Sequence, residues 1–272
     1  MLSIILDNQF VVRLSALLVI VLLVAGWEVL KPRRPLSISK FLRWTNNWSI
    51  SILNTVLLSL VFPVMAVGVA VLASERNWGL FNLLDVPALL SIPSFILAFD
   101  FAIYWQHRFY HWVPVLWRLH RMHHADPDFD VSTGIRFHPA SIILSMLIKM
   151  LVVVLLGPPA LAVLISEVLL NVTTMFNHGN IFISPGIDKF LRLFLVTPDM
   201  HRLHHSVIVR ETNSNFGFNF PWWDRLFGTY QAQPDAGHEA MQIGTHEFRE
   251  QEEERLGRML LQPFRLPSGT NL

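Results

Sequence analysis

The run SISILNTVLLSLVFPVMAVGVAVLAS, residues 49–74, contains no charged side chain. It is longer than the ~20 apolar residues that a helix needs to cross a bilayer. Similar runs lie at about 10–30, 86–106, 140–156 and 160–176. Of the 272 residues, 52% are hydrophobic and only 15% are charged, and the mean hydropathy is +0.42. The sequence therefore predicts an all-α, polytopic membrane protein with four or five membrane helices.

The last two runs are separated by Gly157, Pro158 and Pro159, a combination that breaks helices. Each run has ~17 residues, the lower limit for a membrane span. The pair is therefore expected to form either two full spans or a shallower helical hairpin. In both cases the chain returns to the side of the membrane that it left.

Composition excludes several kinds of protein. A formal net charge of +1 argues against nucleic-acid binding, which requires a strongly basic face. The chain has no cysteine, which excludes disulfides, iron–sulfur clusters, zinc–thiolate sites and thiolate-ligated haem. Any bound metal must therefore be held by His, Asp or Glu side chains.

The distribution of charged residues predicts the orientation in the membrane. Residues 31–48 contain five basic residues and no acidic one, whereas residues 75–85 contain one basic and two acidic residues. Basic loops stay in the cytosol, so 31–48 is expected to be cytosolic. The third run then leads inward, and the pair of runs at 140–176 leaves and returns. Every histidine-rich segment is thus predicted on the cytosolic side.

Ten of the twelve histidines lie between residues 107 and 205. Most of them fall in one HxxxH pair and two HxxHH triplets, whose members are His107 and His111; His120, His123 and His124; and His201, His204 and His205. Spacings of three and four place side chains on one helix face, where two imidazoles can reach one metal ion. These eight ligands suffice for two ions, and either His178 or His138 could complete a shell.

Several interpretations of the histidines compete. Imidazole suits Zn, Fe, Cu and Ni, but a hydrolytic zinc site normally uses three protein ligands, and no HExxH motif occurs. A histidine-rich di-iron centre fits best. A pH-sensing cluster, histidines at a membrane interface, a metal-handling membrane protein and a non-catalytic lipid-binding or scaffold protein are the alternatives.

The pattern resembles the fatty acid hydroxylase / sterol desaturase superfamily, and most of all its bacterial sterol desaturase branch. The resemblance extends over about 95–230. It is carried by FDFAIYWQHRFYH (99–111), LWRLHRMHH (116–124), NHGN (177–180), TPDMHRLHHS (197–206) and ETNSNFGFNFPWWDRLFGTY (211–230).

The resemblance implies a membrane-bound, O2-dependent oxidoreductase that hydroxylates or desaturates a C–H bond of a lipid such as a fatty acyl chain or a sterol. It implies two Fe ions, with Zn as an alternative in a purified or resting form. The implied location is the bacterial inner membrane. Electrons would come from a separate protein of cytochrome b5, ferredoxin or flavin reductase type. The implied metal ligands are His107, His111, His120, His123, His124, His178, His201, His204 and His205.

No catalytic residue beyond these ligands is expected, but three residues are predicted to orient the ligand imidazoles through hydrogen bonds. Asp100 precedes His107 by seven residues within an apolar run. A carboxylate inside a membrane is a functional candidate, and a metal-bound imidazole usually donates its other N–H to such an acceptor. Asn177 and Asp199 are assigned the same role.

Three regions are predicted along the chain. Residues 1–85 form amino-terminal membrane helices, and 86–235 form the catalytic domain, including the membrane hairpin at 140–176. Residues 236–272 form a surface tail whose charged helix ends near Pro263. Residues 180–196 are expected to form an amphipathic helix at the interface, and the lipid is expected to enter from the bilayer through an apolar tunnel between spans.

Overall fold

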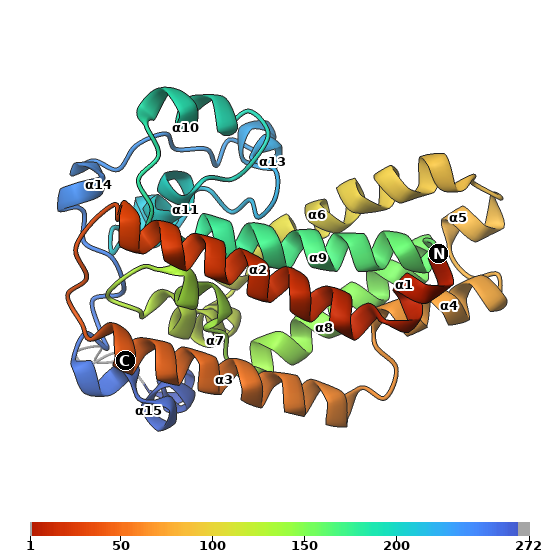
Figure 1. Ribbon diagram of the computed structural model, residues 1–272, viewed down its shortest axis with the longest axis horizontal. Coiled ribbons are helices and arrows are strands. Elements are labelled where there is room, and N and C mark those ends of the chain that lie inside the picture. The colour runs from red at the N-terminus through yellow and green to blue at the C-terminus, as the bar shows by residue number, and fades with distance from the viewer. Residues whose placement is uncertain (1, 266–272) are drawn as a thin grey trace.

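Five long helices form the body of the protein. The computed structural model describes residues 2–265. The long helices are α2 (Gln9–Leu30), α3 (Lys40–Val61), α6 (Ala88–Trp112), α8 (Pro139–Leu156) and α9 (Ala160–Asn177). In Figure 1 they run lengthwise, and α11, α13 and α14 lie at the end where α2 finishes and α3 begins. The predicted all-α architecture is confirmed, since within the described residues extended pairing is limited to isolated β-bridges.

The remaining elements are short and mostly connect or cover the long helices. They are α1 (Leu2–Asp7), α4 (Ala66–Glu75), α5 (Leu80–Leu83), α7 (Pro114–His124), α10 (Pro185–Leu191), α11 (Pro198–His204), α12 (Val209–Thr212), α13 (Trp222–Leu226), α14 (Gly237–Ala240) and α15 (Leu256–Leu261), with 3-10 turns η1 (Val131–Ile135), η2 (Gln251–Glu254) and η3 (Gln262–Phe264).

Five segments of the described chain are long and apolar enough to cross a membrane, as predicted. Their outward faces carry exposed large apolar side chains, for example Leu22, Leu90 and Leu151, which is the pattern of a lipid-facing surface. Helix α9 is the most buried of the five and packs against α2 and α6. It therefore forms the centre of the bundle.

The run at 49–74 lies within one candidate span, Lys40–Leu83, as predicted, but it is not one continuous helix. It is divided between α3, which ends at Val61, and α4, which begins at Ala66. Pro63 lies in the break, where it interrupts backbone hydrogen bonding. Helix α3 also begins earlier than hydropathy indicates, at Lys40, because its polar first turns are buried by partners distant in sequence. Lys40 and Arg43 are therefore helix residues, not loop residues.

The hairpin at 140–176 consists of two antiparallel helices of 18 residues each, α8 and α9. Helix α8 ends at Gly157, which adopts the left-handed conformation with φ of 61°. A β-carbon at Gly157 would lie 2.2 Å from the carbonyl oxygen of Trp78, and one at Gly79 would lie 2.2 Å from the nitrogen of Gly157. Because Gly79 and Gly157 have no side chain, the backbone just before α5 can contact the backbone at the end of α8.

Gly157→Ala is expected to destabilise the protein by more than about 1 kcal/mol, because alanine is strained at this φ and its β-carbon overlaps the Trp78 carbonyl. Thermal unfolding of the purified protein measures the loss. Gly186→Ala is the matched control, since a β-carbon there meets no atom within 4 Å. Equal melting temperatures for the two variants would contradict the close approach.

Two peripheral segments also differ from their predictions. The expected helix at 180–196 is limited to Pro185–Leu191, because residue Ile181 is paired with Pro32 in a β-bridge. The expected surface helix of the tail is instead η2, α15 and η3, and Glu254, Met259 and Gln262 are fully buried. Residues 266–272 of the predicted tail lie outside the described residues.

Candidate metal centre

The predicted histidine segments meet at one end of the bundle. Helix α6 carries the HxxxH pair in its last turns, α7 carries the first HxxHH triplet, and α11 with its C-cap His205 carries the second. His178 is the C-cap of α9. The structure brings all nine predicted ligands together, and eight of them are buried, with His111 partly buried.

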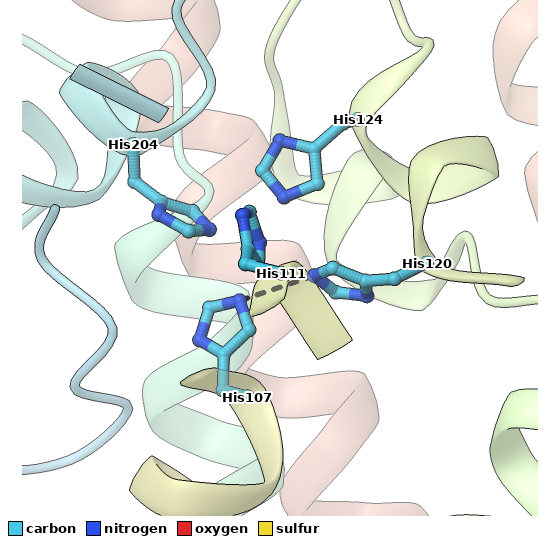
Figure 2. Close-up of side chains that lie close together, drawn as sticks. All are labelled: His107, His111, His120, His124 and His204. Carbon is cyan, nitrogen blue, oxygen red and sulfur yellow. Dashed lines mark hydrogen bonds between the residues drawn. The ribbon is translucent and has the colours of Figure 1, made fainter. Parts of the chain in front are cut away.

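The nine histidines form two groups. The first contains His107, His111, His120, His124 and His204, and the second contains His123, His178, His201 and His205. Within each group one ring nitrogen from every member lies within 4.8 Å of the others. In Figure 2 the rings of His107, His120, His124 and His204 lie around that of His111, and His107 and His111 come from α6. Each group has the dimensions of a site for one metal ion.

Hydrogen bonds to backbone carbonyls fix the outward nitrogen of four rings. The Nδ1–O distances are 2.8 Å for His107 and Phe216, 3.2 Å for His123 and Arg136, 2.8 Å for His178 and Thr174, and 2.7 Å for His204 and Ser214. A carbonyl oxygen only accepts, so Nδ1 carries the hydrogen in each ring. In the neutral ring, Nε2 is then left with a free lone pair, the form that binds a metal.

The inward nitrogens lie close enough together to share one cation. Nε2 of His178 lies 3.2 Å from Nε2 of His123 and 3.1 Å from Nε2 of His201. His123 and His178 both have their hydrogen on Nδ1, so two lone pairs face each other in the second group. Further buried ring nitrogens have no partner among the described residues, including those of His124 and His205. This donor set fits a bound cation.

Burial keeps the imidazoles neutral. It lowers the pKa of His120, His123 and His124 well below the usual value, and neighbouring histidines lower these pKa values further. The same causes act on His201 and His205. Metal ligation requires neutral imidazole, so protons do not compete strongly for these nitrogens near neutral pH.

Within the described residues Asp100 makes no hydrogen bond to a histidine, contrary to its prediction. Its carboxylate accepts hydrogen bonds from the Trp223 indole N–H at 2.8 Å and from the backbone N–H of Asn219 at 3.2 Å. Seven residues of helix separate Asp100 from His107 by ~10 Å, which is too far for a hydrogen bond. Asp100 instead anchors the loop whose Phe216 carbonyl holds His107.

Asp224 anchors the same loop from the other side. Its carboxylate accepts from the backbone N–H of Phe216 at 2.8 Å and of Gly217 at 2.9 Å, and from the hydroxyl of Thr229 at 2.7 Å. No spacing relative to the histidines indicates this role. The only sequence signal is the concentration of Asn, Gly and aromatic residues in 211–230.

Asn177 and Asp199 also differ from their predicted role. Asn177 donates to the carbonyl of Phe218 at 3.2 Å, and Asp199 pairs with Arg33 and Arg202. Neither makes a hydrogen bond to a metal-group histidine within the described part of the chain. Residues one or two positions apart on a helix face different directions, so closeness in sequence to a ligand does not place these side chains beside it.

Buried ion pairs join α3 to the segment that follows α7, and the sequence did not predict them. Arg43 contacts Asp126 through two hydrogen bonds of 2.7 Å and Asp130 through one of 2.6 Å, and all three side chains are 0% exposed. Burial alone would raise the pKa of Asp126, but the Arg43 charge and hydrogen bonds lower it below its usual value. Arg136, whose carbonyl holds His123, pairs with Glu254.

The remaining histidines lie outside both groups. His138 is the N-cap of α8, where its Nδ1 accepts from the backbone N–H of Ala140 at 3.2 Å. His238 lies 3.7 Å from Asp199, and His246 is exposed. His138 therefore has a structural role and does not complete a metal shell.

A cavity of about 460 Å³ leads from the histidines into the bundle. Its lining includes His107 and His120 and residues of α2, α3, α6, α8 and α9. Phe10 and Leu14 on α2 line it and are also exposed on the outer surface. The cavity therefore opens toward the region where lipid would lie, and its size suits a small-molecule ligand.

Membrane-length helices that carry two groups of buried imidazoles at one end define an integral-membrane protein with sites of metal-binding geometry. The family model described as "Fatty acid hydroxylase" matches residues 92–229, and the chain belongs to this family.

Curated relatives carry related names. The chain is 30% identical over 148 residues to Ornithine lipid hydroxylase OlsE of Rhizobium tropici, with 54% of this chain and 44% of that protein aligned. It is 31% identical over 159 residues to Alkylglycerol monooxygenase of Homo sapiens, covering 58% and 34%. It is 30% identical over 157 residues to Lathosterol oxidase of Homo sapiens, covering 58% and 48%. The chain thus spans less than half the length of these relatives. No solved structure matches it.

Proposed function

We propose that this chain is a membrane-bound di-iron oxidoreductase that uses O2 to hydroxylate or desaturate a C–H bond of a lipid. The observation that carries the proposal is the 3.2 Å separation of Nε2 atoms in His123 and His178, both of which donate through Nδ1 to carbonyls. A cation bound between them would relieve this contact. Family membership and the first group, which contains five histidines, support the same conclusion.

The donor set favours two ions held by the nine predicted ligands, five for one and four for the other. All are neutral imidazoles, so the positive charge of the ions is largely uncompensated. Bound iron would supply the activation of O2, whereas zinc, which has no redox chemistry, would represent a resting form. The protein's own part is to fix the rings through the carbonyls of Phe216, Arg136, Thr174 and Ser214 and to exclude bulk water.

A lipid substrate is supported by the cavity and by the names of the relatives. The cavity begins at exposed apolar residues of α2 and ends at His107 and His120. A hydrocarbon can therefore reach the histidines without crossing water. The names of the three relatives describe action on an ornithine lipid, an alkylglycerol and lathosterol.

We further propose that the metal centre faces the cytosol, in a bacterial inner membrane. The basic segment after α2 lies at the histidine end of the bundle, where Arg33 N–H donates to Asn180 at 3.0 Å and Phe182 N–H donates to Lys31 at 3.0 Å. Basic loops are cytosolic. A separate electron-transfer protein of cytochrome b5, ferredoxin or flavin reductase type would approach from that side.

The same reasoning assigns roles to the three regions. Residues 1–85 supply membrane helices and one wall of the cavity, and 86–235 supply every proposed ligand. Residues 236–272 are the carboxyl-terminal region, in which Glu254 forms an ion pair with Arg136.

Elemental analysis of the purified protein tests the metal assignment, with two irons per chain as the expected result. Chelation under reducing conditions is expected to abolish lipid oxidation, and addition of Fe(II), but not of Zn(II), is expected to restore it.

Lipids from cells with and without the gene are expected to differ in one class by a gain of one oxygen or a loss of two hydrogens. Lipid oxidation by metal-free protein would overturn the proposal.

A further inference from the structure

The cavity extends from the histidines along one face of α8. Ser141, Ser145 and Lys149 line it at intervals of four residues, a spacing that places them on one helix face. The Tyr110 hydroxyl donates to the Ser141 carbonyl at 2.9 Å, and the Tyr110 ring stacks on His120. Ser141 therefore marks the histidine end, and Lys149 lies ~12 Å farther along α8, away from the histidines.

Lys149 faces the cavity and not the lipid. The exposed apolar residues of α8 are Leu147, Leu151 and Leu155, which form a separate stripe at the same interval of four. Lys149 lies two residues from Leu147 and from Leu151, which is more than half a helical turn and places it on the opposite face. Its ammonium group is thus directed inward.

Three charged side chains line the end of the cavity that lies away from the histidines, namely Arg13, Lys149 and Glu167. Arg13 and Glu167 form an ion pair. Within the described residues, Lys149 makes neither a hydrogen bond nor an ion pair. With all three ionised, this end, called here the cationic end, carries one net positive charge.

An ammonium group inside a membrane bundle is costly unless it has a partner, and ionisable groups at such positions face a substrate path or another charge. Glu167 is already paired with Arg13, so its charge is largely neutralised. The surplus positive charge in a cavity that opens to lipid is therefore complementary to a ligand with one negative charge.

We propose, on the basis of the proposed function, that Lys149 determines specificity by selecting lipids that carry a single acidic group, with a carboxylate as the simplest case. The cationic end holds this acid, and the hydrocarbon extends toward His107 and His120. The carbon presented to the metal centre then lies ~12 Å from the acid. The enzyme oxidises a remote position of the chain and not the carbon beside the acid.

Binding to the iron-loaded, full-length protein in nanodiscs tests this selectivity. The probes are palmitate, hexadecanol and hexadecyltrimethylammonium, which share a chain length and differ in charge. Wild type is expected to bind palmitate about tenfold or more tightly than the other two probes. Lys149→Met is expected to lose that preference through weaker palmitate binding, with hexadecanol binding unchanged. Lys189→Met, at an exposed lysine of α10, is the matched control and is expected to behave as wild type.

Lys149→Arg separates the effect of charge from an effect on folding, because it keeps the positive charge and should retain the palmitate preference. Equal palmitate binding by wild type and Lys149→Met, or loss of the preference in Lys149→Arg, would overturn the proposal. Iron content and lipid oxidation are measured on the same preparations. Selective palmitate binding without any oxidation contradicts only the proposed function, and oxidation without selectivity contradicts only the role of Lys149.

Discussion

His178→Ala is expected to lower the iron content from two ions to one per chain and to reduce lipid oxidation by more than about 100-fold. Its Nε2 lies between those of His123 and His201, at 3.2 and 3.1 Å. It is also the only member of either group that α9 contributes. Losing an outer-shell partner of a metal already costs about 10–100-fold, so removing a central ligand exceeds that range. The five-histidine group contains no residue from α9 and should retain its ion.

Iron analysis and oxygen consumption measured on the same sample check this result. His246→Ala is the control, because His246 is exposed and belongs to neither group. If His178→Ala kept both irons and full activity, the assignment of the second group would be wrong.

Arg43→Met is expected to destabilise the protein by about 3–5 kcal/mol, the usual cost of breaking a buried ion pair from one side. Arg43 holds Asp126 and Asp130 through three hydrogen bonds of 2.6–2.7 Å, with no exposed surface on any of the three residues. Methionine fills a similar volume but leaves two carboxylates buried without their ion-pair partner. These carboxylates lie in the segment that directly follows α7. The helix that carries the first HxxHH triplet should therefore be held less rigidly.

Thermal unfolding in detergent measures this change, and Arg258→Met at an exposed position is the control. A triple variant, Arg43→Met with Asp126→Asn and Asp130→Asn, should recover part of the lost stability, because no unpaired charge then remains. A single variant as stable as the Arg258→Met control would show that the buried pairs are unimportant.

The membrane helices and the ligand set follow from the sequence for a simple physical reason. Apolar runs are a local property, and helical spacing converts HxxxH and HxxHH directly into shared faces. What local pattern does not contain is the identity of a partner far away in the chain. The start of α3 was therefore misplaced, because Arg43 and Asn47 resemble loop residues until Asp126 and Ser132 are known to cover them.

The support of the ligands could not be predicted for a related reason. Side-chain carboxylates were expected to orient the rings, but backbone carbonyls hold His107 and His204. Every residue has a carbonyl, so the sequence carries no sign of which one is used. Asp100 lies within the candidate span Ala88–Trp112, and it acts through Trp223 and Asn219.

The buried carboxyl-terminal segment has a consequence for the order of biogenesis. Glu254 completes the pair with Arg136, and Arg136 supplies the carbonyl that orients His123. Arg121, beside His120, also donates to the carbonyl of Gln262. These contacts form only after residues 254–262 have left the ribosome, long after the membrane helices have been synthesised. Insertion of the membrane helices into the bilayer is therefore expected to precede completion of the histidine centre.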